Sequence, residues 1–315
     1  MTTAAAAPAT GWRPLAVTWL RRLLLLAVLG AAGYYLATRW SQVWHTLRAV
    51  SPTDAVASQL AVFAAMIAAT AGWQAVVDEL GPPVGAFRGG QIYLVGQLGK
   101  YLPGSVWAYL LQMELGRKAG VARARVFTAS LVQLGISLVT ALALGIAALP
   151  VMLRHMSNAV WLFALLPVGL VLLHPRVLTW GTSQVLRLLR RPPLDHPLRW
   201  QLVAKVLGSA VATYLLYGLH LWLLAGSGMD AGGILLCTGA IAIGLNAGLL
   251  LFVLPSGAGL RDVVVAAVLA TTLGPVRAAA FAVVSRLMFT VGDIATAAVA
   301  ALLARWRSPL PTGER

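Results

Sequence analysis

Long uninterrupted runs of apolar residues, separated by short stretches that hold most of the charged residues, dominate the pattern along this chain. A helix needs about 20 apolar residues to cross the hydrocarbon core of a bilayer. A transmembrane barrel would instead show short segments of alternating polarity. The pattern therefore predicts membrane-spanning helices over residues 23–38, 55–77, 126–153, 159–173, 202–225, 233–254 and 278–303.

Local signals refine one of these predictions and add a further apolar run. Ser51 can cap the helix over 55–77, with Pro52 in its first turn and Asp54 available for a capping box. Residues 263–273 form an apolar run that is too short for an ordinary span. When this run is counted as a crossing, the chain crosses the membrane about eight times.

Composition supports this class of protein. Hydrophobic residues make up 59% of the 315 residues and charged residues only 10%, against about 25% charged in an ordinary soluble domain. The single Cys237 excludes a disulfide scaffold. We therefore predict an all-α polytopic membrane helix bundle, with a cytoplasmic N-terminal segment over 1–20, a membrane domain over 21–305 and a cytoplasmic tail over 306–315.

The net charge of +15 is distributed in bursts between the apolar runs. The eight-crossing topology places 17 Lys and Arg residues inside, four outside (Arg39, Arg48, Arg154 and Arg277) and three at or within the membrane (Lys100, Arg261 and Arg286). This asymmetry follows the positive-inside rule, so we predict a multi-pass protein of the cytoplasmic membrane with both termini in the cytoplasm. No polar domain is present to carry a nucleic-acid face, and nucleic acid is excluded as a partner.

One stretch, residues 91–113, is apolar but interrupted. The break lies within the sequence Lys100-Tyr101-Leu102-Pro103-Gly104-Ser105. Pro103 lacks a backbone hydrogen-bond donor, and Gly104 tolerates backbone conformations that other residues avoid. Broken backbone at membrane depth persists only inside protein or beside a water-filled cavity. We therefore predict a re-entrant broken helix whose second half begins near Ser105, where free N–H groups and Lys100 would attract an anion.

A second break, Pro255-Ser256-Gly257-Ala258-Gly259-Leu260-Arg261-Asp262, repeats this arrangement. An Arg-Ala-x-x-Phe sequence follows each break, at Arg123 and at Arg277. Interrupted segments at matching positions in two halves indicate an inverted repeat with a binding site between the halves. The alternative reading is that Pro and Gly only mark loops.

The remaining ionisable residues support two readings. Arg286 and Asp293 lie within the last predicted helix, where charge is by default a sign of function, but Arg286 could instead form a structural pair with Asp262 or Asp293. We expect Glu114 to form a local ion pair with Arg117 or Lys118, and His220 to be a satisfied core histidine. The sequence has no phosphate-binding loop and no metal-ligand spacing, so we expect no catalytic residues, no metal and no cofactor.

The residues Leu98–Trp107, Gly120-Val121 and Leu254–Asp262 resemble the lysylphosphatidylglycerol synthase transmembrane region, also called the flippase-like domain family. The resemblance covers about residues 20–305. It implies a domain that binds and translocates lipids, beside which some relatives carry a soluble aminoacyltransferase or glycosyltransferase domain. Such relatives commonly have a glutamate after the second break, where this chain has Asp262.

These observations predict a protein that binds an anionic lipid or a polyprenyl-phosphate lipid and moves it across the membrane. Two alternatives stay open: a membrane component of a glycosyl- or aminoacyl-transferase system, with Asp262 or Glu114 essential, and a non-transporting scaffold for a separate cell-envelope enzyme. The oligomeric state is left open. The candidate substrate-binding residues are Lys100, Tyr101, Pro103, Gly104, Ser105, Gly257, Gly259, Arg261, Asp262 and Arg286.

Overall fold

The computed structural model describes residues 50–102, 106–146, 173–188, 196–226, 232–250 and 259–307, with a few single positions between them. The described residues form helices joined by turns, so the predicted all-α class is confirmed. The predictions that lie outside the described residues are the spans over 23–38 and 159–173, most of the two terminal segments, and the site residues Pro103, Gly104, Ser105 and Gly257.

Four helices in the described part of the chain are long and apolar enough to cross a membrane. They are α3 (Pro52–Glu79), α6 (Arg123–Gly145), α11 (Trp200–Ala225) and α14 (Pro275–Arg307). Each was predicted as a span from its apolar run. The count of eight crossings stays a prediction, because two of the expected spans lie outside the described residues.

The predicted start of α3 is confirmed. The Ser51 hydroxyl accepts a hydrogen bond from the Asp54 backbone N–H at 3.0 Å, and Pro52 occupies the first turn. A serine at this position satisfies a backbone donor that the helix itself leaves unpaired.

The first interrupted stretch folds as a helical hairpin, which we call the first hairpin (residues 86–118). Its first arm comprises α4 (Ala86–Gly90), the π-helix η1 (Gln91–Val95) and the 3-10 helix η2 (Leu98–Tyr101), and its second arm is α5 (Trp107–Lys118). Leu102 ends the first arm in an extended conformation, with φ −81° and ψ 146°, as expected for the residue before a proline.

The two arms of the first hairpin make a close backbone approach at Gly99. A Cβ atom at this position would lie 2.6 Å from the carbonyl carbon of Trp107 and 2.7 Å from the Cα of Ala108. No side chain fits there, so glycine is what allows the arms to pack closely beside the break.

The second break also lies within a helical hairpin, the second hairpin, formed by α12 (Gly233–Leu250) and α13 (Leu260–Leu273). Gly259 precedes α13 with a φ of +94°, a conformation that favours glycine. Its N–H donates to the Asp262 carboxylate at 3.4 Å. The short helix that the sequence predicted over 263–273 therefore begins three residues earlier.

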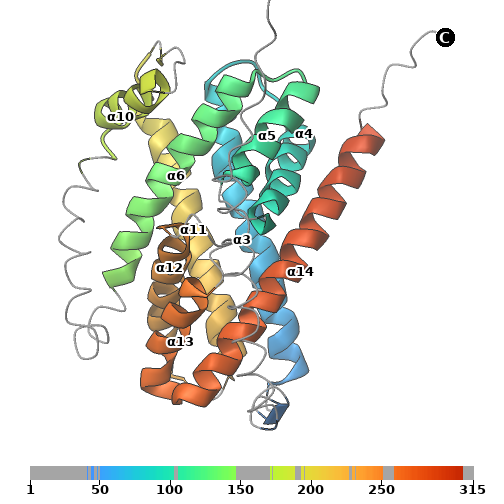
Figure 1. Ribbon diagram of the computed structural model, residues 1–315, viewed down its shortest axis with the longest axis vertical. Helices are drawn as coiled ribbons and strands as arrows, with labels where there is room; N and C mark the ends of the chain where they lie inside the picture. Colours follow the sequence, from blue (N-terminus) through green and yellow to red (C-terminus); the bar gives the residue numbers. More distant parts are fainter. Residues whose placement is uncertain are drawn as a thin grey trace, which may run out of the picture. The chain divides into compact units, whose positions relative to one another are not determined.

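The two hairpins extend toward each other from opposite ends of the helix bundle (Figure 1). The first hairpin contacts α14 through η1 and η2, and the second contacts it through α13. The polar core of the long helices lies nearby: the His220 ring on α11 pairs with Ser58 of α3 at 2.7 Å and with Ser285 of α14 at 2.9 Å. His220 is thus a satisfied core histidine, as the sequence indicated.

Candidate functional site

One face of α14 connects the two hairpins. Arg286, Phe289 and Asp293 are separated by three and four residues, a spacing that places them on the same side of a helix. Each of the three contacts a hairpin residue from elsewhere in the sequence. The face therefore brings together the residues beside the two breaks.

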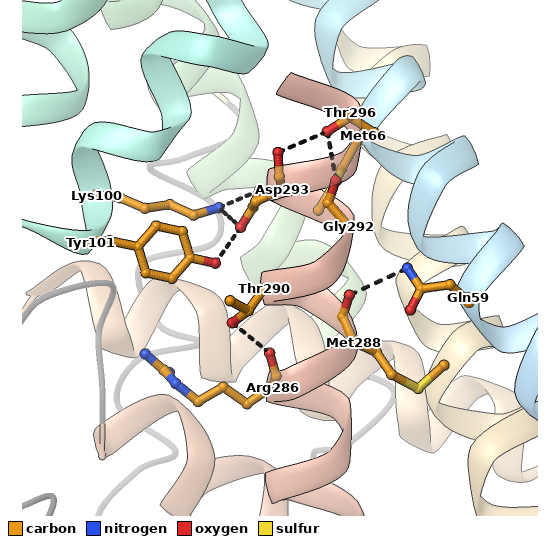
Figure 2. A network of polar contacts seen from close by, with 10 residues as sticks. All are labelled: Gln59, Met66, Lys100, Tyr101, Arg286, Met288, Thr290, Gly292, Asp293 and Thr296. Atoms are coloured by element: carbon orange, nitrogen blue, oxygen red, sulfur yellow. Dashed lines mark hydrogen bonds and ion pairs between the residues drawn. The ribbon is translucent and has the colours of Figure 1, made fainter. Parts of the chain in front are cut away.

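Asp293 binds the tip of the first hairpin (Figure 2). The Lys100 ammonium lies 2.7 Å from Oδ2 and 2.9 Å from Oδ1 of Asp293, and the Tyr101 hydroxyl donates to Oδ2 at 2.6 Å. The Asp293 side chain is 5% exposed and that of Lys100 is 29% exposed. Lys100 is therefore a neutralised cation, because a nearly buried carboxylate binds it directly.

Phe289 and Arg286 bind the start of α13 in the second hairpin. The Arg261 guanidinium lies 4.0 Å from the centre of the Phe289 ring, in a cation–π arrangement. The Arg286 Nη1 lies 3.2 Å from Oδ2 of Asp262. Of the two structural partners that the sequence allowed for Arg286, the structure selects Asp262.

Arg261 is the cation that these contacts leave uncompensated. It is only 6% exposed, and it forms neither an ion pair nor a hydrogen bond with any residue that the structure describes. The five charged groups on and around the α14 face are three cations and two carboxylates, and both carboxylates bind other cations. A buried charge without a partner is costly, so this site has a net attraction for an anion.

A cavity of about 270 Å³ opens beside Arg261 and Lys100, both of which line it. Phe289 contributes an aromatic wall. The other polar side chains in the lining are uncharged and come from the first hairpin and from α6, α11 and α12: Gln97, Tyr109, Ser137, Tyr214, Tyr217 and Asn246. A concave site with a few convergent polar groups is typical of small-molecule binding.

An apolar groove of about 700 Å³ lies between α3, α4, η1 and α14. Its lining includes Phe63, Ile67 and Leu303, and its only polar residues among those described are Thr70, Gln74 and Thr296. Thr296 is three residues beyond Asp293 on α14. The groove therefore begins within one helical turn of the Lys100–Asp293 pair.

The structure brings together Lys100, Tyr101, Gly259, Arg261, Asp262 and Arg286 of the predicted site residues, around α14. Tyr101 is not among the described residues that line the cavity, since its hydroxyl binds Asp293 instead. Sequence reasoning did not anticipate the partnership of Lys100 with Asp293. It also missed the neutral lining from α6, α11 and α12, because helix packing sets which polar residues of separate spans meet.

The base of the first hairpin carries a separate, exposed ion cluster. Glu114 of α5 lies 2.6 Å from the guanidinium groups of both Arg117 and Arg123. Hydrogen bonds from Arg117 and Arg123 lower the pKa of Glu114 from its ordinary value near 4.5 to about 2. The expected local pair with Arg117 is thus confirmed, whereas the second partner is Arg123 of α6 rather than Lys118.

This arrangement of apolar spans, broken hairpins and buried charge defines a multi-pass helical membrane protein. The chain belongs to the family described as lysylphosphatidylglycerol synthase TM region, whose profile matches residues 18–306, nearly the whole chain. The resemblance noted in the sequence is thereby confirmed. No curated protein matches the chain significantly.

Proposed function

We propose that this protein binds the anionic headgroup of a membrane lipid in the cavity between the two hairpins and moves the lipid between the leaflets of the cytoplasmic membrane. The observation that carries the proposal is Arg261, a nearly buried cation that lines the cavity and lacks a carboxylate partner among the described residues. A lipid phosphate or pyrophosphate would supply the missing negative charge through charge-assisted hydrogen bonds.

The apolar groove between α3 and α14 would receive part of the hydrocarbon chain of this lipid. Its lining is almost entirely apolar, and it begins within one turn of the pair that flanks the cavity. A lipid whose headgroup and chain are bound separately need not expose its charge to the hydrocarbon core. No chemical transformation is part of this proposal.

Charge distribution supports the proposed topology. The basic residues that were expected inside belong to elements at one end of the bundle: the start of α6, α10 (Pro175–Leu188), the start of α11 and the end of α14 (Figure 1). The starts of α3 and α14 lie at the other end. We propose that the first end is cytoplasmic and that each hairpin enters the membrane without crossing it fully. The runs over 233–254 and 263–273, predicted from the sequence as two crossings, then form one returning hairpin, and six of the eight predicted crossings remain. This placement makes the hairpins an inverted pair, as in transporters whose repeats surround a central site.

Lipid movement in proteoliposomes tests the function. Purified protein would be reconstituted with a fluorescent phosphatidylglycerol, and the fraction accessible to an external quencher would be followed over time. We expect Arg261→Met to slow exchange at least tenfold, because a charge-assisted hydrogen bond contributes about 1.5–3 kcal/mol. The matched control is Arg277→Met, since Arg277 also lies over a phenylalanine ring, 6.0 Å from the centre of Phe281, but is exposed.

Two results would count against the proposal. Exchange at the rate of protein-free liposomes in the wild type would remove the transport function and favour a scaffold. Equal rates in Arg261→Met and Arg277→Met would remove Arg261 from the site. Topology is tested independently by single cysteines at exposed positions, labelled with a membrane-impermeant maleimide. The background variant is Cys237→Ala, which removes the single native cysteine, a fully buried residue.

A further inference from the structure

The charges and neutral groups of the cavity determine which headgroup it accepts. We infer that the cavity selects a lipid whose phosphate carries an uncharged, hydroxyl-bearing headgroup, and that it rejects headgroups with an ammonium group, including aminoacylated ones. This inference rests on the proposed function, because it concerns the substrate of the same site.

The placement of carboxylates disfavours an ammonium group in the cavity. An ammonium group is bound most strongly by a carboxylate, and none lines the cavity among the described residues. Asp293 is bound to Lys100 and Tyr101, and Asp262 is bound to Arg286. An ammonium group would therefore enter beside the uncompensated Arg261, with no carboxylate free to receive it.

None of the other described carboxylates, namely Asp54, Asp78, Glu79, Glu114 and Asp230, lines the cavity. Asp78 accepts from Gln74 and from the Val84 N–H, and Asp230 accepts from the Gly233 N–H. Glu114 binds two arginines outside the cavity. Residues 103–105 and 251–258, which belong to the two breaks and lie outside the described residues, contain neither Asp nor Glu in the sequence. The chain therefore offers no carboxylate from these segments either.

The uncharged polar lining of the cavity favours a hydroxyl-bearing headgroup. The Tyr214 hydroxyl lies 2.9 Å from the Ser137 Oγ and 2.9 Å from the Asn246 Nδ2, so one continuous network joins α6, α11 and α12 at the cavity. Hydroxyl and amide groups both donate and accept hydrogen bonds, as the hydroxyls of a polyol or a sugar do. An ammonium group only donates, so it could use only half of this capacity.

Aromatic faces offer ammonium groups an alternative through cation–π contact, but the closest candidate is already used. Arg261 lies over the Phe289 ring, and the Tyr217 ring packs against Phe289 with a centre-to-centre distance of 4.5 Å. A second cation at this position would meet the Arg261 charge directly. The aromatic wall therefore serves the protein's own cation.

Competition between lipids of equal net charge tests the inference. Native mass spectrometry of the full chain would compare phosphatidylinositol with phosphatidylserine, both at net charge −1 and with identical acyl chains, against a phosphatidylcholine background. We expect at least a tenfold preference for phosphatidylinositol. A second pair, phosphatidylglycerol and its lysyl ester, should show a larger preference for the unmodified lipid.

A designed reversal sharpens the test. Gln97→Glu keeps the shape of a lining side chain and adds one carboxylate to the cavity, so it should shift the preference at least tenfold toward phosphatidylserine. Gln201→Glu is the matched control, because it adds the same charge at an exposed position on α11. An unchanged preference in Gln97→Glu would overturn the charge-balance argument.

The outcomes separate this inference from the proposed function. If phosphatidylinositol and phosphatidylserine bind equally and both displace phosphatidylcholine, the site binds anionic lipids and the headgroup inference is wrong. If phosphatidylserine or the lysyl ester is preferred, the inference is wrong in sign. If neither anionic lipid displaces phosphatidylcholine, the proposed function fails, and the inference fails with it.

Discussion

The two hairpins place a cation beside a Gly- and Pro-rich break in similar ways, yet the two cations end in different electrostatic states. Lys100 in the first hairpin binds Asp293 at 2.7 Å and is part of a satisfied network. Arg261 in the second is less exposed, and it faces an aromatic ring instead of a carboxylate. A similar local sequence signal thus gives one structural cation and one that is available to a ligand.

This difference shows that a charge near a break does not by itself identify the binding group. The deciding factor is what α14 presents opposite each hairpin: Asp293 faces the first, and Phe289, one turn away, faces the second. A carboxylate compensates its partner, whereas a ring stabilises a cation without cancelling its charge. Variants that exchange or remove these partners therefore test the comparison directly.

The largest effect is expected from closing the space in the first hairpin. Gly99→Ala would place a methyl group against the Trp107 backbone, which cannot move aside as a side chain can, so we expect a loss of about 3 kcal/mol in the free energy of unfolding. Denaturant titration in mild detergent measures this. In the second hairpin, a Cβ at Gly244 would lie 2.9 Å from a methyl group of Val265 and 3.2 Å from the Arg261 carbonyl oxygen. These approaches are longer than those at Gly99, so Gly244→Ala should cost less.

Gly208→Ala is the control for these glycine variants. Gly208 lies in α11 with no atom near an added Cβ, so alanine there should leave stability unchanged or raise it by up to about 1 kcal/mol. If Gly99→Ala behaved like Gly208→Ala, the close approach of the two arms would not contribute to stability.

The next effect concerns the compensated cation. Asp293→Asn should lower the free energy of unfolding by about 2–3 kcal/mol. Breaking a fully buried ion pair costs about 3–5 kcal/mol, and the cost is smaller here because Lys100 is partly exposed. It should also increase the retention of phosphatidylglycerol, since Lys100 loses its counter-charge. Arg261→Met is the matched variant and should not lower stability. A stability loss in Arg261→Met equal to that in Asp293→Asn would show that both cations are structural.

A smaller effect is expected from the hydroxyl that supports this pair. Tyr101→Phe removes one donor to Asp293, and hydrogen bonds to charged groups contribute about 1.5 kcal/mol at the lower end of their range. Thermal unfolding monitored by tryptophan fluorescence would detect this change. Tyr109→Phe removes a hydroxyl that forms no hydrogen bond with a described residue, so it should differ little from the wild type.

The smallest effect is expected at the base of the first hairpin. Because its pKa is lowered to about 2, Glu114 contributes stability that is present above its ordinary pKa near 4.5 and is lost as pH falls toward 2. The difference in melting temperature between the wild type and Glu114→Gln should thus be constant from pH 8 to pH 5 and shrink below pH 4. A difference that already falls between pH 7 and pH 5 would contradict the lowered pKa.

Several elements followed from local sequence rules. Apolar length predicted α3, α6, α11, α12 and α14 to within several residues, since burial in lipid requires such runs. The break at Leu102 and the glycine at 259 followed from backbone restrictions that act within a few residues. The amphipathic helix α10 was not predicted, because it lies among the basic residues of a segment that reads as a polar loop.

The sequence by itself determined the class of protein, the positions of the long helices and the two breaks with their cations, because hydrophobic length, proline and glycine act locally. Tertiary structure alone decided the partner of each cation. Asp293 lies in the same helix as Arg286, yet it binds Lys100, which lies 193 residues away in the sequence. Such pairings depend on how separate helices pack, and this packing leaves Arg261 without a carboxylate partner among the described residues.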